Sequence, residues 1–229
     1  MDYKLPRQEI CSKVRSFGMR KIKEDDLHVP KAKLLHLNQI ADVMKKIELA
    51  GLPDHLIVVK LKGKLGHGVF LRPDAKPILR GEAIAPYSGD VYVAPQNSGE
   101  GSDYAFSLLS DLKLTKEEQK IFDPKGRFHP RRLYSIDLDA DKKGNFTRFI
   151  NHSATPNVEA RMVRIPKNSL GLEPAPFEIV YFAKKKILPG EQLLVCYEGE
   201  DNSYWGALNI KPFPMNPRTF RLNKDLKIV

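Results

Sequence analysis

The chain has 229 residues, of which 41% are apolar and 29% charged, and its formal net charge is +10. This length suits one large domain, or one domain with extensions, with ample residues for a core. No apolar run approaches the ~20 residues that span a bilayer, and the N-terminus lacks the apolar core of a signal peptide. The only cysteines, Cys11 and Cys196, cannot build a disulfide framework. We therefore expect a cytoplasmic or nuclear protein without a membrane span.

The positive charge comes from 38 basic against 28 acidic residues, which favours association with nucleic acid or another acidic surface. The lysines are dispersed along the chain, however. The short clusters Lys184–Lys186 and Arg131–Arg132 are also typical of solvated surfaces. Charge alone therefore leaves both interpretations open.

The N-terminal part predicts a helix over residues 31–50. Its apolar residues recur at three- and four-residue steps, as in an amphipathic helix: Leu34, Leu37, Ile40, Ala41, Met44 and Ile47. The pattern ends before Gly51 and Pro53. Such a helix either supports the main domain or forms a contact in a homodimer.

From Leu56 the pattern changes to short strands separated by turns. The predicted strands span residues 56–61, 69–71, 81–87, 90–93, 104–109, 133–138, 158–165, 177–183 and 192–197. A second helix is predicted over residues 110–122, with Thr115 and Glu118 as its capping pair. Many short strands and few helices predict a mostly β (α+β) domain with a helical N-terminal flank.

Four short motifs combine glycines with hydroxyl, amide or aromatic side chains. They are Gly66-His67-Gly68, Tyr87-Ser88-Gly89, Arg148-Phe149-Ile150-Asn151-His152-Ser153 with Pro156-Asn157, and Gly190-Glu191-Gln192-Leu193 with Tyr197-Glu198-Gly199. Each motif alone is typical of a turn followed by a strand, and we expect the third to be a rigid loop entered from a buried strand through Phe149 and Ile150. In this order and spacing, over about residues 56–205, the motifs resemble the SET-domain protein lysine methyltransferases.

The resemblance implies a SET-type fold of several small β-sheets. In that family the Asn-His-Ser segment and the last, tyrosine-bearing segment form a threaded, knot-like C-terminal crossing, which would bring Asn151 and Tyr197 together. We accordingly expect an N-terminal flank at residues 1–55, a SET catalytic domain at 56–205 and a closing segment at 206–229.

The resemblance also implies a reaction, methyl transfer from S-adenosylmethionine to a lysine amine. The implied cofactor-binding residues are Gly66, His67, Gly68, Arg148, Asn151, His152 and Trp205. Tyr197 would orient the amine, while Tyr87 and Tyr104 would wall a narrow aromatic channel. A free lysine has a pKa of about 10.4, and an apolar channel disfavours its charged form, which helps to free the lone pair.

Two departures from the family pattern change the expected site. Many members carry a cysteine after Asn-His-Ser and a cysteine-rich tail that together hold zinc, whereas here the position is Ala154 and no cysteine follows Cys196. We therefore expect no metal, and a lid in which Trp205 either contacts the cofactor or the channel, or packs on the core. The second departure is the small size of Val195 and Ala160, which leaves room near the amine and predicts di- or trimethylation.

The implied partner is a lysine-containing basic protein, such as a histone or histone-like chromatin protein. A protein of charge +10 would repel it unless the cleft is acidic, and four acidic residues flank Tyr197 in the sequence: Glu191, Glu198, Glu200 and Asp201. Alternatively, the basic surface binds nucleic acid and thereby brings the enzyme to a DNA-bound substrate.

Two other functions stay open: a SET-like module that only binds proteins, and a nucleic-acid-binding protein, although no interleaved aromatic and basic residues support the latter.

Overall fold

The computed structural model describes residues 51–96, 102–123, 129–163, 178–198, 211–218 and 220–229. The predicted helix at 31–50 and the candidate cofactor residue Trp205 lie outside these ranges. No helix among the described residues is long and apolar enough to cross a membrane.

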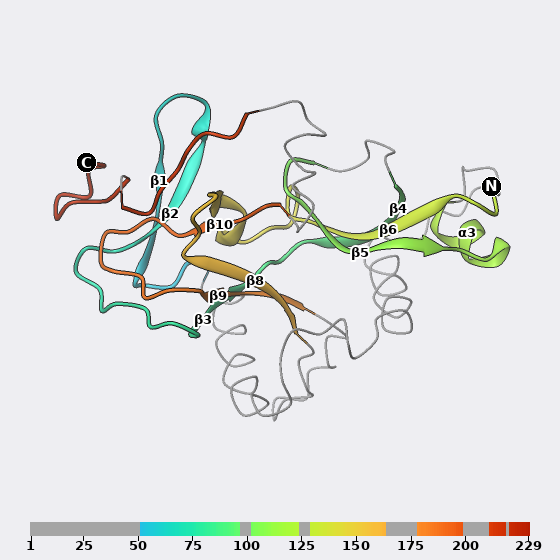
Figure 1. The fold of residues 1–229 in the computed structure, drawn as a ribbon, viewed down its shortest axis with the longest axis horizontal. Helices are drawn as coiled ribbons and strands as arrows, with labels where there is room; N and C mark the ends of the chain where they lie inside the picture. The colour runs from blue at the N-terminus through green and yellow to red at the C-terminus, as the bar shows by residue number, and fades with distance from the viewer. Residues whose placement is uncertain (1–50, 97–101, 124–128, 164–177, 199–210, 219) are drawn as a thin grey trace. The chain divides into compact units, whose positions relative to one another are not determined.

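The described residues form short strands, two 3-10 helices and one α-helix (Figure 1). In chain order they are β1 (Leu56–Lys60), η3 (Gly63–Leu65), β2 (His67–Leu71), β3 (Ala83–Pro86), β4 (Asp90–Pro95), β5 (Ala105–Lys113), α3 (Lys116–Phe122), β6 (Leu133–Asp139), η4 (Phe146–Phe149), β7 (Asn151–His152), β8 (Val158–Val163), β9 (Glu178–Ala183) and β10 (Leu194–Val195). Within these ranges the strands make small sheets in the orders β1-β2, β10-β7, β3-β9-β8 and β4-β6-β5. The predicted mostly β architecture is confirmed.

The chain divides into two compact units. The described part of the first unit consists mainly of residues 87–144 and contains the β4-β6-β5 sheet. The second unit contains residues 51–86, 145–161 and 179–229 where these are described, with the other sheets.

The sheet of the first unit is antiparallel, with β6 in the centre. On β6, Tyr134, Ile136 and Leu138 alternate with more polar residues and are at most 3% exposed, as expected for a strand with one face on the core. β4 pairs with β6 without interruption from Asp90↔Asp139 to Pro95↔Tyr134.

The helix predicted over residues 110–122 begins later, at Lys116. Residues up to Lys113 belong instead to β5, which shifts its register twice and still pairs Leu112 with Tyr134. Asp111 has a φ of 58°, a left-handed conformation that an α-helix cannot continue through. The predicted capping box is confirmed, because Thr115 and Glu118 satisfy each other's backbone N–H groups.

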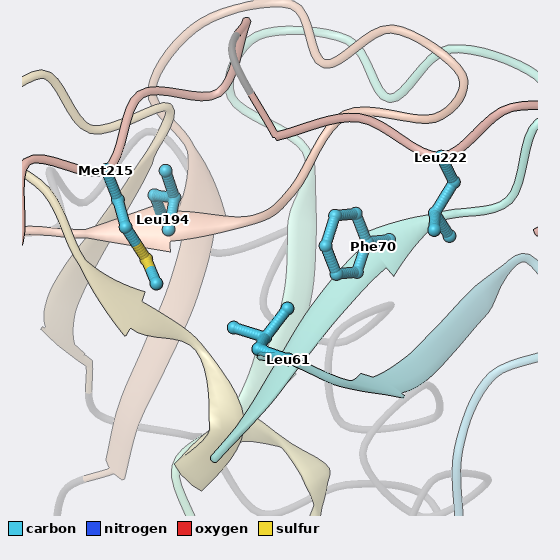
Figure 2. Packing of buried hydrophobic residues seen from close by; sticks show 5 residues of the cluster. All are labelled: Leu61, Phe70, Leu194, Met215 and Leu222. Atoms are coloured by element: carbon cyan, nitrogen blue, oxygen red, sulfur yellow. The ribbon is translucent and has the colours of Figure 1, made fainter. Parts of the chain in front are cut away.

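In the second unit, the antiparallel hairpin β1-β2 and the C-terminal segment share one hydrophobic cluster (Figure 2). Its buried members are Leu61, Phe70, Leu194, Met215 and Leu222. Phe70 is on β2 and Leu194 on β10, while the last two come from the C-terminal residues 211–229. This tail has little periodicity in its sequence, but two apolar side chains attach it to the core.

Candidate active site

The third and fourth sequence motifs lie side by side as β7 and β10. The strands pair in parallel, with Asn151 opposite Leu194 and His152 opposite Val195. Two stretches that are far apart in the sequence therefore meet, as the resemblance implied. They meet through this parallel strand pair.

Buried side chains complete this two-residue pair, and Asn157 contributes most. Its Nδ2 donates to the carbonyl of Gln192 (2.9 Å), and its Oδ1 accepts from the N–H of Leu194 (2.9 Å). Its own N–H donates to the carbonyl of Leu194 (3.1 Å). Asn157 is 3% exposed, so these bonds replace water and fix the last strand against the third motif.

The chain enters the third motif through the 3-10 helix η4, so the expected entry from a buried strand is wrong. Asn145 caps this turn, because its Oδ1 accepts from the N–H of Thr147 (3.0 Å) while its Nδ2 donates to the carbonyl of Pro86 (2.9 Å). An asparagine that bonds to neighbouring backbone favours a turn over a strand.

Tyr197 is held at both ends by the third motif. Its hydroxyl donates to the carbonyl of Ile150 (2.8 Å), and its backbone N–H donates to Nδ1 of His152 (3.0 Å). The two bonds set the orientation of the side chain, and because the residue is 36% exposed, part of its surface faces outward. A phenol that donates to a carbonyl presents its oxygen as an acceptor to other groups.

His152 acts through its side chain as the partner of Tyr197. Its ring lies 5.5 Å from the tyrosine ring, centroid to centroid, and the residue is buried. Burial lowers the pKa of His152 from the ordinary value of 6.5, while the negative charge of Glu198 opposes that shift. The neutral imidazole that results can accept the tyrosine N–H at Nδ1.

Asn151 connects the third motif to the first. Its Nδ2 donates to the carbonyl of His67 (2.7 Å), in the Gly66-His67-Gly68 turn. Among the described residues, its Oδ1 accepts no hydrogen bond. Gly66 has a φ of 66°, so the turn needs a residue that tolerates the left-handed region.

Phe149 brings two other candidate residues to the same place. The His67 ring lies 5.2 Å from the Phe149 ring, and the Arg148 guanidinium lies 4.8 Å from its centroid. His67 is exposed, and Arg148 and Phe149 are half-buried. The structure thus gathers Gly66, His67, Arg148, Asn151 and His152, which the resemblance assigned to the cofactor.

Gly68 has a structural explanation that the sequence did not reveal. A Cβ at this position would lie 2.5 Å from Nε2 of Gln192, a side chain that is fully buried. The close approach that glycine permits is therefore to a protein side chain of the fourth motif. Gln192 was missed as a contributor because a polar residue between glutamate and leucine carries no local sign of burial.

The two predicted channel tyrosines of the first unit contact each other. The Tyr87 hydroxyl donates to the backbone carbonyl of Tyr104 (2.6 Å), and Tyr87 is 6% exposed. Ser102 Oγ accepts from the N–H of Tyr104 (3.0 Å) and donates to Asp139 (2.6 Å). Tyr87 thus supports the backbone of Tyr104, and the channel role of both residues stays a prediction.

The expected acidic rim loses one of its members. Glu191 is 7% exposed, and its carboxylate accepts from the N–H of Leu188 (2.8 Å), which closes the turn before the last strand. Glu198 is half-buried beside His152, and the other two rim residues lie outside the described ranges.

Comparison with known proteins identifies similar chains. The SET domain profile matches residues 66–198, more than half of the chain. The chain is 36% identical over 135 residues to human histone-lysine N-methyltransferase 2B, covering 58% of this chain and 4% of that protein. It is 40% identical over 70 residues to the H3 lysine-4 specific histone-lysine N-methyltransferase of Schizosaccharomyces pombe, covering 29% of this chain and 7% of that protein. The chain thus spans less than a tenth of the length of either relative.

Two solved structures are also similar. The methyltransferase domain of human PR domain-containing protein 2 is 25% identical, with a TM-score of 0.41, covering 71% of this chain and 89% of that one. The structure of KRYPTONITE in complex with mCHH DNA, an H3(1-15) peptide and SAH is 24% identical, also with a TM-score of 0.41, covering 66% of this chain and 25% of that one.

Proposed function

The chain belongs to the SET domain family, and on that premise we propose that it is an S-adenosylmethionine-dependent protein lysine N-methyltransferase. SET methyltransferases use S-adenosylmethionine, and the curated relatives named above are histone-lysine methyltransferases. The proposed substrate is a lysine of a histone or another basic chromatin protein, which would place the enzyme in the nucleus.

The observation that carries this proposal is the meeting of three motifs around Tyr197. Asn151 is bonded to the carbonyl of His67, and Tyr197 is bonded to Ile150 and His152, so each motif is in contact with the next. A module that only bound other proteins would not need a partly exposed tyrosine fixed by both its hydroxyl and its N–H.

The residues at the meeting point suit the cofactor's chemistry. With its Nδ2 committed to His67, Asn151 presents an amide oxygen that can accept from an ammonium group. We assign cofactor binding to Gly66, His67, Gly68, Arg148, Asn151 and His152, and Trp205 is added from the sequence alone. When bound, S-adenosylmethionine supplies an activated methyl group on a sulfonium.

Tyr197 would act on the substrate amine by orientation. Because its hydroxyl donates to Ile150, its oxygen can accept an N–H of a neutral lysine amine or a weak C–H contact from the methyl group. Methyl transfer is an in-line displacement, so holding the amine on line with the methyl carbon is the main contribution required of the protein. The lysine must reach this position unprotonated, which an aromatic channel favours.

Transfer of a labelled methyl group from S-adenosylmethionine to purified histones, read by mass spectrometry, tests the function. We expect Tyr197→Phe to reduce kcat on the order of 100-fold and Asn151→Ala to raise the KM for S-adenosylmethionine. The matched control is Tyr134→Phe, which removes a hydroxyl that donates to Asp123 in the first unit. If wild type neither binds the cofactor nor labels any histone, the interaction-module alternative stands instead.

The same spectra report how many methyl groups are added. Val195 is buried on β10 directly opposite His152, and Ala160 is half-buried on β8, so neither places a large aromatic ring near the site. We expect di- or trimethyllysine at saturating cofactor, and monomethyl product alone would contradict this.

Repeating the assay with DNA across a salt series separates direct from DNA-assisted substrate binding, because phosphate contacts weaken steeply with salt.

A further inference from the structure

Met215 connects the C-terminal segment to both loops that the proposed function assigns to the cofactor. It lies beyond residues 66–198, which the SET domain profile matches. Its side chain is 5% exposed and packs in the hydrophobic cluster with Phe70 and Leu194 (Figure 2). Met215 also makes two polar contacts, one with Ser153 and one with Gln192.

The first connection is to the Asn-His-Ser segment. Ser153 Oγ donates to the backbone carbonyl of Met215 (2.6 Å) and accepts from the N–H of Thr155 (3.0 Å). The N–H of Ser153 donates to the carbonyl of Val195 (2.9 Å), and the residue is fully buried. The hydroxyl therefore joins the tail to the residue that directly follows Asn151 and His152.

The second connection is to the glycine turn. Nε2 of Gln192 lies 4.0 Å from Sδ of Met215. The same Nε2 occupies the space beside Gly68 that a Cβ would need. Because Gln192 is fully buried between the two, a displacement of Met215 changes the support on which the Gly66-His67-Gly68 turn rests.

We propose that Met215 is a positioning residue that couples the docked C-terminal segment to the shape of the cofactor site. It acts through Ser153 on the Asn-His-Ser segment and through Gln192 on the glycine turn. The consequence for the cofactor rests on the proposed function, whereas the coupling itself is a property of the protein without a ligand.

The test compares Met215→Ala with Leu222→Ala in the full chain. Both residues belong to the same cluster, come from the same tail and are 5% exposed. The backbone N–H of Leu222, however, donates to the carbonyl of Gly190, and among the described residues Leu222 is not bonded to Ser153 or Gln192. Amide hydrogen exchange without cofactor measures the opening of residues 66–68 and 151–153. Calorimetric titration with S-adenosylmethionine measures the affinity of the site for the cofactor.

Both variants are expected to lower the Tm, but only Met215→Ala should speed exchange of both loops, on the order of tenfold, and weaken S-adenosylmethionine binding by a similar factor. Met215→Leu lacks the sulfur but conserves the volume that packs against Gln192, so it should restore both. Should Met215→Ala not fold, Ser153→Ala removes the hydrogen bonds that the Ser153 hydroxyl makes with Met215 and Thr155. It should speed exchange at 151–153 but not at 66–68.

The proposal is overturned if Met215→Ala leaves the exchange rates of both loops unchanged. It is also overturned if Leu222→Ala, at the same loss of Tm, speeds exchange of both loops as much as Met215→Ala does, or if Ser153→Ala speeds exchange equally at both loops. If wild type does not bind S-adenosylmethionine, the proposed function fails, and the exchange data still decide whether Met215 positions the loops.

Discussion

The β4-β6-β5 sheet of the first unit and the β7-β10 pair of the second unit are stabilised in different ways. The sheet has long antiparallel ladders, so backbone hydrogen bonds and the alternating apolar residues of β6 hold it. The β7-β10 pair is only two residues long, and the buried side chain of Asn157 adds two hydrogen bonds that join its two segments. Single polar substitutions should therefore be mild in the sheet and severe at the pair, which is also where the candidate active site lies.

The largest effect is expected from Asn157→Ala. It removes an amide that bonds the carbonyl of Gln192 and the N–H of Leu194, and both backbone groups stay buried without that partner. Leaving buried polar groups unpaired should lower the free energy of unfolding by about 2–4 kcal/mol, measured by urea denaturation.

The matched variant in the sheet is Ser135→Ala on β6. Ser135 is also buried, and its Oγ donates to Asp137 (2.7 Å), but the strand keeps its ladder on both sides. We expect a loss of about 1 kcal/mol or less. Equal losses at Ser135 and Asn157 would remove the distinction between the two regions.

A smaller effect, confined to acidic pH, is expected at His152. Its pKa in the folded protein lies below the ordinary 6.5, so the unfolded chain takes up a proton at this position first. The contribution of neutral His152 to stability is therefore complete above pH 6.5 and is lost as the pH falls through the lowered pKa. Protonation of Nδ1 also removes the acceptor for the Tyr197 N–H, a bond of about 1 kcal/mol.

Urea midpoints between pH 8 and pH 5 measure this loss, and His152→Asn is the control. Asparagine places an acceptor oxygen near the position of Nδ1 and does not titrate, so its curve should be flatter than that of wild type. Parallel curves for the two proteins would show that His152 does not carry the pH dependence.

The difference between the long ladders of the sheet and the two-residue β7-β10 pair also explains which features could be predicted from the sequence. The strand at Leu133–Asp139 follows from local alternation, and the Thr115–Glu118 capping box from its spacing. Nothing local marks the pairing of Asn151 with Leu194, since two-residue strands have no period, so the resemblance to a family was needed. The attachment of Met215 was missed for a related reason, because one buried methionine in an irregular tail has no pattern around it.

The smallest effect is expected from Asp111→Gly on β5, because Asp111 is the one non-glycine residue of this strand with a left-handed φ. Asp111 has a φ of 58° and an exposed side chain where β5 shifts its register between Leu109 and Leu112. Asp111→Gly relieves the backbone but gives the unfolded chain more freedom, so we expect a change within about 0.5 kcal/mol. Asp111→Val should cost about 1–2 kcal/mol, because β-branched residues tolerate positive φ poorly.

Lys113→Val is the control for Asp111→Val, since it places the same side chain on an exposed position of the same strand at an ordinary φ. Its urea midpoint should stay within about 0.5 kcal/mol of wild type. If both valine variants are equally stable, the register shift does not depend on the left-handed residue. The ladder would then tolerate backbone changes as readily as it is expected to tolerate the loss of a polar side chain, and the contrast with the β7-β10 pair would become sharper.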